Sequence, residues 1–272
     1  MQLGLSTYSF PWAFGVPSEG YSSTMDLEDL FLVAEKYGIQ RVQVGDNYPL
    51  HELTETELNR LAKQALTLGI QVEVGTRRLE TDHINNYLMI AGLFYSPFLR
   101  VVIDDNGFEP TFGEILSTIR SLLPSLKEKS IVLAIENHDR FPASQLQDLI
   151  TQTDENLLGI CLDTANSLGA NEGIDTVLDH LAPYVVNLHI KDIHIQRLPH
   201  KMGFTVEGCA AGEGILDIPQ MVEALTPFQK CESATLEVWS SPLEKKENTL
   251  KQERGWVEKS LNYLSSLAVW ES

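Results

Sequence analysis

The chain has 272 residues, of which 43% are hydrophobic, and its formal net charge is −18. This length exceeds the commonest size of one domain but matches one α/β barrel of about 250 residues. The acidic charge argues against nucleic acid and anionic membrane as partners, while three cysteines without a Cys-X-X-Cys pair and no signal-peptide pattern favour a cytoplasmic protein.

Strand and helix patterns alternate through the first half of the chain. Thr54, with Glu57 three residues later, predicts a capping box at the start of one helix, and Pro124 predicts a kink or break in another. The strands expected in this half are residues 2–7, 41–44, 71–74 and 99–103. The helices expected here are residues 27–37, 54–69, 82–94 and 112–129.

The second half repeats the scheme, apart from a longer polar loop before its third helix. Its expected strands are residues 131–136, 158–162, 184–189 and 234–238. Its expected helices are residues 143–152, 173–181, 218–225 and 247–267. Eight strand–helix units predict a single (β/α)8 TIM barrel that occupies residues 1–272 as one domain. An open doubly wound sheet is the competing fold, but no GxGxxG loop follows the first strand.

Four successive strands of the second half end at a residue type that binds metal ions. These residues are Glu136, Asp163, His189 and Glu237. Because the carboxyl ends of parallel barrel strands converge on one mouth, the four side chains are expected to meet there. Three clustered carboxylates repel one another without a cation. A set of carboxylates and imidazole without thiolate favours one divalent ion such as Mn²⁺, Co²⁺, Mg²⁺ or Zn²⁺.

The surrounding motifs resemble the xylose isomerase-like TIM-barrel superfamily of sugar phosphate isomerases and epimerases. The matches are AIEN at Glu136, CLDTAN at Asp163, NLHIKD at His189 and TLEVW at Glu237. Their order resembles the ligand set of the ketose 3-epimerase branch, which implies a metal role for all four residues, with Mn²⁺ favoured. The resemblance also implies a catalytic role for Glu136 and Glu237, one removing a proton beside a carbonyl and the other returning it.

The expected function is therefore a metal-dependent isomerase or epimerase of a sugar or sugar-like hydroxy-carbonyl substrate, acting through a metal-stabilised enediolate. A dehydratase or lyase on the same barrel is an alternative, because proton removal beside a carbonyl also leads to elimination. A non-catalytic sugar-binding barrel is another. An abasic-site endonuclease, which shares the superfamily, is disfavoured by the acidic composition. Homo-oligomerisation is left open by the resemblance.

Four further residues are candidates for binding the substrate. Asn166 stands where the epimerase branch often has a histidine, so it can bind a hydroxyl but cannot transfer a proton near neutral pH. Lys191 points to the same side of its strand as the metal-type histidine two positions earlier, with an ion pair to Asp192 or to another acid as the alternative. Arg197 is the basic residue of the following loop, and His138 is either a substrate contact or an ordinary polar loop residue.

Basic and aromatic side chains also gather in the expected mouth loops. The basic ones suggest a substrate with a phosphate or carboxylate group, or else pair with nearby acids. The aromatic ones after the first strand suggest an apolar wall for a sugar ring, with a barrel lid or subunit contact as alternatives. The two sets are Arg77, Arg78, Arg140, Lys191, Arg197 and Lys201, and Tyr8, Phe10, Trp12 and Phe14.

Overall fold

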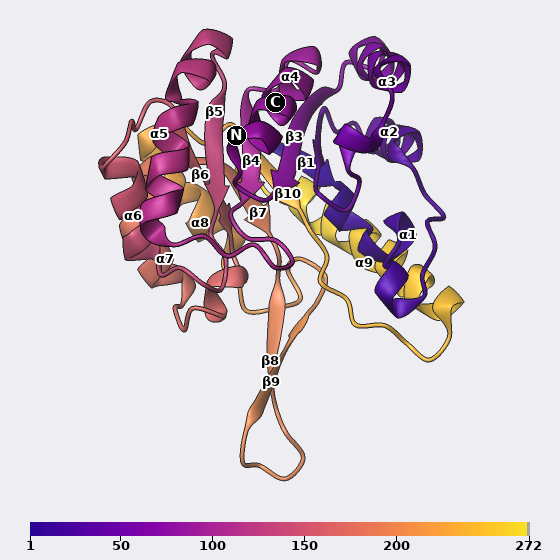
Figure 1. The fold of residues 1–272 in the computed structure, drawn as a ribbon. Helices are drawn as coiled ribbons and strands as arrows, with labels where there is room; N and C mark the ends of the chain where they lie inside the picture. The colour runs from indigo at the N-terminus through magenta and orange to yellow at the C-terminus, as the bar shows by residue number, and fades with distance from the viewer. Residues whose placement is uncertain (271–272) are drawn as a thin grey trace.

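Eight parallel strands form a closed barrel in the computed structural model, which describes residues 1–270 (Figure 1). Consecutive barrel strands are neighbours, and β1 pairs with both β2 and β10 to close the ring. The barrel strands are β1 (Gln2–Ser6), β2 (Arg41–Val44), β3 (Gln71–Arg77), β4 (Phe98–Val102), β5 (Val132–Glu136), β6 (Leu158–Asp163), β7 (Val185–Ile190) and β10 (Ser233–Leu236). The predicted TIM-barrel fold is confirmed.

Helices connect the strands and cover the outside of the barrel (Figure 1). The predicted capping box is present, since Thr54 and Glu57 cap each other's backbone at the start of α3. Pro124 lies inside α5, which continues through it as one helix. The helices are α1 (Pro11–Phe14), α2 (Leu27–Lys36), α3 (Glu55–Thr67), α4 (Thr81–Leu93), α5 (Phe112–Lys129), α6 (Ala143–Thr151), α7 (Ile174–Leu181), α8 (Ile218–Leu225) and α9 (Lys246–Ser266).

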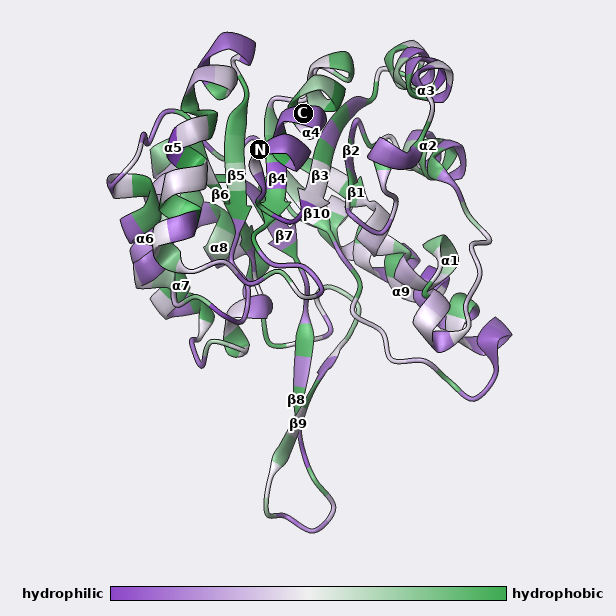
Figure 2. Ribbon diagram, in the orientation of Figure 1, coloured by the Kyte–Doolittle hydropathy of each residue, from purple (hydrophilic) through white to green (hydrophobic). Residues whose placement is uncertain are grey.

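Alternation along the strands separates an apolar outer layer from a polar barrel interior. Val42 and Val44 of β2 belong to the apolar cluster that the helices cover. Gln43, between them, points inward and donates a hydrogen bond to Asn187 of β7 across the barrel. Figure 2 shows a mostly hydrophobic β5 in the barrel wall and mostly hydrophilic residues along α3. Barrel interiors are usually filled by branched apolar residues, so a polar interior points to a function there.

The segment after β7 corrects the sequence-based expectation of a polar loop. Strands β8 (Ile193–Arg197) and β9 (Phe204–Gly208) pair antiparallel and project away from the barrel (Figure 1). Ile195 and Val206 lie opposite each other, and so do Gln196 and Thr205, so one face is apolar and the other polar. This short alternation is the strand signal that the polar composition concealed. Within residues 1–270, no helix is both long and apolar enough to cross a membrane.

Candidate active site

The structure brings together the four metal-type residues that were predicted at the ends of successive strands. Glu136 ends β5, Asp163 ends β6, His189 lies in β7 and Glu237 follows β10 directly. All four side chains are buried. The Nδ1 atom of His189 lies 3.6 Å from Glu136 Oε2, 3.8 Å from Asp163 Oδ2 and 3.4 Å from Glu237 Oε1. Three carboxylates therefore surround one imidazole nitrogen at the carboxyl end of the barrel.

The atoms at the centre of this cluster fit a cation. His189 Nδ1 and Asp163 Oδ2 are buried and make no hydrogen bond within residues 1–270. Candidate ligand atoms of Asp163, His189 and Glu237 all lie within 4.8 Å of one another. Burial opposes ionisation of Glu237, but the charges of His189 and Lys191 outweigh it and lower the pKa of this carboxyl. The donor set is the one that hard and borderline divalent ions bind.

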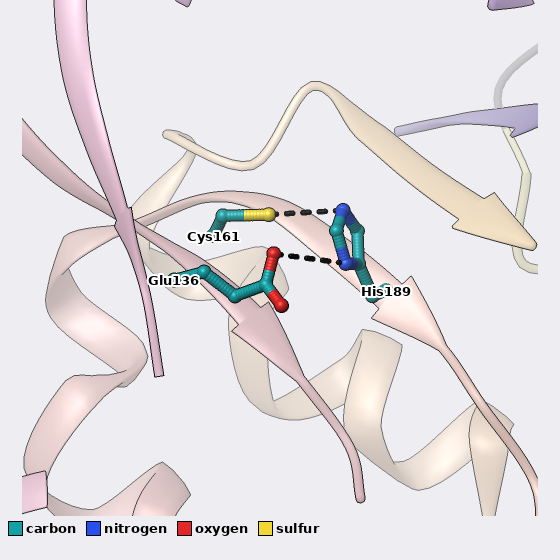
Figure 3. A group of neighbouring side chains, drawn as sticks. All are labelled: Glu136, Cys161 and His189. Atoms are coloured by element: carbon teal, nitrogen blue, oxygen red, sulfur yellow. Dashed lines mark hydrogen bonds and ion pairs between the residues drawn. The ribbon is translucent and has the colours of Figure 1, made fainter. Parts of the chain in front are cut away.

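Cys161 approaches the same histidine from the other side. Its sulfur lies 3.0 Å from Nε2 of His189, whereas Glu136 faces Nδ1. Figure 3 shows these two side chains at opposite nitrogen atoms of the ring. Burial raises the pKa of the Cys161 thiol to about 11, so the group is neutral at physiological pH. Cys161 is therefore a neighbour of the carboxylate cluster and not a member of it.

Two cationic side chains neutralise the cluster. Lys191 places Nζ 2.7 Å from Asp163 Oδ2 and 3.0 Å from Glu237 Oε2. Arg100 of β4 contacts Glu136 through Nε and lies 2.8 Å from Asp46 through a terminal nitrogen. Burial disfavours the charged guanidinium, yet Glu136 and Asp46 hold the pKa of Arg100 well above its usual value. The site thus holds cationic and anionic side chains close to one another and shields both from bulk water.

The ion pair expected as the alternative role of Lys191 is formed with Asp163 and Glu237 and not with Asp192. The carboxylate of Asp192 instead accepts backbone N–H groups of the next loop, from Gly212 and Gly214 at Oδ2 and from Leu216 at Oδ1. The side chain is buried. Asp192 therefore organises the loop that follows the hairpin, and Lys191 is left to the carboxylate cluster.

A cavity of about 740 Å³ opens above the cluster. Three of the four predicted substrate-binding residues line it, namely His138, Asn166 and Lys191. Asn166 donates a hydrogen bond from Nδ2 to Glu136 Oε1 at 2.9 Å. Arg197 is not brought to the cavity, because it lies on the projecting hairpin, stacks on Phe204 with its guanidinium carbon 4.5 Å from the ring centroid, and donates to the Lys201 carbonyl.

Of the basic and aromatic residues expected in the mouth loops, some line the cavity and others do not. Arg77 lines the cavity, and its buried Nε lies 3.6 Å from Asp46 Oδ2 and 4.0 Å from Asp105 Oδ1 without a hydrogen bond within the described chain. Arg78 pairs with Glu80 at 2.8 Å, and Arg140 pairs with Asp104, so local acids account for both. Among the aromatic residues, Tyr8 and Trp12 line the cavity, whereas Phe10 and Phe14 belong to the apolar core.

Sequence reasoning did not single out Arg100, Asp46 or Gln43. Arg100 and Asp46 line the cavity, and Gln43 accepts a hydrogen bond from the imidazole of His189. The available signal was a charged or amide residue inside an otherwise apolar strand, as in FLRVV and RVQV. In a barrel, such a residue points into the interior and needs a partner there.

Comparisons with known proteins support the same family and fold. A family model described as xylose isomerase-like TIM barrel matches residues 33–265. The 3-oxo-isoapionate decarboxylase of Pectobacterium atrosepticum is 33% identical over 264 residues, which cover 97% of this chain and 95% of that protein.

Two solved structures share the fold at low sequence identity. D-psicose 3-epimerase from Clostridium cellulolyticum H10 superposes with a TM-score of 0.73 at 14% identity, covering 97% of each chain. A xylose isomerase-like TIM barrel protein from Mycobacterium smegmatis, in complex with magnesium, gives a TM-score of 0.68 at 12% identity, again covering 97% of each chain. At these identities the likeness concerns the fold alone.

Proposed function

The chain belongs to the xylose isomerase-like TIM-barrel family, and from this membership we propose that it is a metal-dependent decarboxylase of a sugar-derived 3-oxo acid. The observation that carries the proposal is that each of the two glutamates at the cavity floor is paired with a cationic side chain. Glu136 is held by Arg100 and Asn166, and Glu237 is held by Lys191. The decarboxylase relative, which aligns along nearly the whole chain, supports the same reaction class.

This pairing favours decarboxylation over two-base chemistry. An epimerase needs one carboxylate to remove a proton and a second to return it from the opposite face. Carboxylates held by a guanidinium and an ammonium are weak bases, and in the metal-free site the charges of a protonated His189 and of Lys191 lower the pKa of Glu237 further against the effect of burial. In decarboxylation, the broken C–C bond supplies the electron pair, so no basic carboxylate is required.

Glu136, Asp163, His189 and Glu237 are the residues that would hold the divalent ion. When bound, the ion supplies a Lewis acid for the negative charge that develops on the oxo oxygen of the substrate. Arg77 lies at the cavity wall, and its Nε makes ion-pair contacts to Asp46 and Asp105 but no hydrogen bond within residues 1–270, so its guanidinium would bind the substrate carboxylate. His138 and Asn166 would contact hydroxyl groups, and Trp12 would cover an apolar face of the carbon skeleton.

Lys191 is the proton donor in this proposal. Burial disfavours its charged form, but Asp163 and Glu237 outweigh burial and raise the pKa of the ammonium, so Nζ holds its proton at neutral pH. When the bond to the carboxyl carbon breaks, carbon dioxide leaves and the electron pair delocalises onto the oxo oxygen. Lys191 Nζ then gives its proton to the carbon that lost carbon dioxide, and solvent restores the ammonium.

A direct assay tests the proposal. The purified protein is dialysed against EDTA, supplied with Mg²⁺, Mn²⁺, Co²⁺ or Zn²⁺ in turn, and given 3-oxo-isoapionate. We expect metal-dependent release of carbon dioxide and a product lighter by that amount. D-psicose serves as the comparison substrate, since its 3-epimerisation leaves the mass unchanged. Stable metal binding without carbon dioxide release from any 3-oxo sugar acid would contradict the proposal.

The isomerase or epimerase predicted from the sequence is the second candidate. It is favoured by one observation, the presence of both Glu136 and Glu237 in the wall of one cavity. Conversion of D-psicose to its epimer at unchanged mass would support this candidate, and loss of water from a sugar acid would support the dehydratase alternative.

A further inference from the structure

A chain of amide side chains lies beneath the carboxylate cluster, inside the barrel. Gln43 comes from β2 and Asn187 from β7, two residues before His189 on the same strand, so both β7 side chains point inward. Gln43 is 1% exposed, and Asn187 and His189 are fully buried. Their polar groups therefore have only one another and nearby barrel atoms as partners.

The orientation of Asn187 is fixed by a backbone carbonyl. Its Nδ2 lies 3.3 Å from the carbonyl oxygen of Ser233, which can only accept a hydrogen bond, and 3.0 Å from Thr235 Oγ1. The Oδ1 atom of Asn187 consequently faces the other way, toward Gln43. Reversing this amide would place two carbonyl oxygens against each other in a buried site.

The orientation of Gln43 follows from that of Asn187. Gln43 Nε2 donates to Asn187 Oδ1 at 3.1 Å, which leaves Gln43 Oε1 facing His189 Nε2 at 2.7 Å. Turning the Gln43 amide alone would bring its oxygen against Asn187 Oδ1. Cys161 fits the same pattern, because its thiol donates to Asn187 Oδ1 at 3.1 Å and leaves sulfur lone pairs toward Nε2.

We propose that Gln43, oriented by Asn187, is a positioning residue that fixes the proton of His189 on Nε2 and so leaves Nδ1 as the nitrogen presented to the divalent ion. Gln43 Oε1 is an acceptor, so Nε2 is the nitrogen that keeps a hydrogen when the ring is neutral. Nδ1, which faces the three carboxylates, is then the nitrogen with the lone pair. The inference rests on the metal site of the proposed function and extends it to the layer below.

The first test observes the proton directly. Long-range ¹H–¹⁵N spectra of the uniformly labelled, Mg²⁺-saturated protein report the tautomer of each histidine, and comparison with a His189→Asn variant assigns the signal of interest. We expect His189 to show the Nε2–H tautomer. A Nδ1–H tautomer at His189, or an even mixture of both, would overturn the proposal without any variant at Gln43.

The second test removes the acceptor. Gln43→Met keeps the length of the side chain and deletes the amide, whereas Gln43→Glu keeps an acceptor oxygen. By titration calorimetry with Mn²⁺, we expect Gln43→Met to weaken the metal Kd by about 10- to 100-fold and Gln43→Glu to restore most of the affinity. Both variants are first checked for an unchanged far-ultraviolet circular dichroism spectrum. A folded Gln43→Met variant with the wild-type Kd would overturn the proposal.

The outcomes also separate this inference from the proposed function. A protein that binds Mn²⁺, shows the Nε2–H tautomer and releases no carbon dioxide would contradict the decarboxylase and support the role of Gln43. A protein that decarboxylates its substrate but shows the Nδ1–H tautomer would support the decarboxylase and contradict the role of Gln43. A wild-type protein that binds no divalent ion would overturn both.

Discussion

Lys191 and Asp163 form an ion pair at the point where the metal site is proposed, with Nζ 2.7 Å from Oδ2. A carboxylate oxygen has two lone pairs, so Asp163 Oδ2 keeps one for another cation beside this contact. Glu237 Oε2 lies 3.0 Å from the same ammonium. One lysine thus neutralises two of the carboxylates that a divalent ion would bind, and the two cations compete for the same negative charge.

Replacing this lysine should separate the two roles. In Lys191→Met, the buried carboxylates lose a neutralising charge, so we expect a lower Tm in EDTA than that of the wild type and a larger rise in Tm on adding Mn²⁺. Because the proposed proton donor is missing, kcat for decarboxylation should fall by about 10²- to 10⁴-fold. Lys259→Met, at an exposed lysine paired with Glu213, is the control and should leave the Tm in EDTA, the rise in Tm on adding Mn²⁺ and kcat unchanged. Wild-type kcat in Lys191→Met would exclude the lysine as proton donor.

The role of Glu237 in metal binding is tested by metal content. Glu237→Gln keeps the shape of the side chain but removes its charge, and neutral amide oxygens are weaker ligands than carboxylates. We expect about one divalent ion per chain in the wild type and much less in the variant, measured by mass spectrometry after gel filtration. Glu207→Gln changes a carboxylate in the same cavity wall, outside the cluster, and should retain the ion. Equal metal content in both variants would count against Glu237 as a ligand.

The fold could be predicted from the sequence because each barrel strand is a short apolar run bounded by helix signals. The family resemblance is confirmed as well. The hairpin was missed for a physical reason, since β8 and β9 pair only with each other and their residues alternate between apolar and polar in a segment rich in charge. Such a segment resembles a loop until its pairing partner is known.

The site was predictable where chemistry coincides with strand ends, and not where it depends on packing across the barrel. Glu136 and His189 stand at the ends of apolar runs, so their convergence follows from topology. Arg100 lies in the middle of β4, and its contacts to Asp46 and Glu136 join three different strand units. Arg197 was expected at the cavity as the basic residue of the loop after β7, but it lies on the hairpin strand β8 and is not among the residues that line the cavity.

Asp192 should matter for stability more than for catalysis. It accepts three backbone hydrogen bonds of the loop after the hairpin and another from Ile193 N, and carboxylate acceptors make stronger hydrogen bonds than amides. We expect Asp192→Asn to lower the free energy of unfolding by about 2 kcal/mol, measured by urea denaturation at fixed Mn²⁺ concentration. Metal affinity should stay at the wild-type value, because Asp192 does not contact the cluster. A larger loss of metal affinity than of stability would contradict this structural role.

Glu253 introduces a pH dependence of stability that is independent of the metal site. It extends from α9 and accepts backbone hydrogen bonds from Trp12 at 2.7 Å and Ala13 at 3.2 Å, with no exposed surface. Burial raises the pKa of this carboxyl from 4.5 to about 7, against the opposite effect of the two N–H groups. Between these two values, the folded protein holds a proton that the unfolded chain releases.

The free energy of unfolding should therefore fall as the pH rises from about 4.5 to about 7, and this group adds no further change above that window. The full effect is about 3 kcal/mol at most. Glu253→Gln cannot titrate, so subtracting its stability from that of the wild type at each pH, by urea denaturation in EDTA, isolates the contribution of Glu253. We expect this difference to decline with increasing pH and to level off near pH 8. A difference that rises with pH would mean that the two backbone N–H groups outweigh burial and hold Glu253 as an ionised cap of α1.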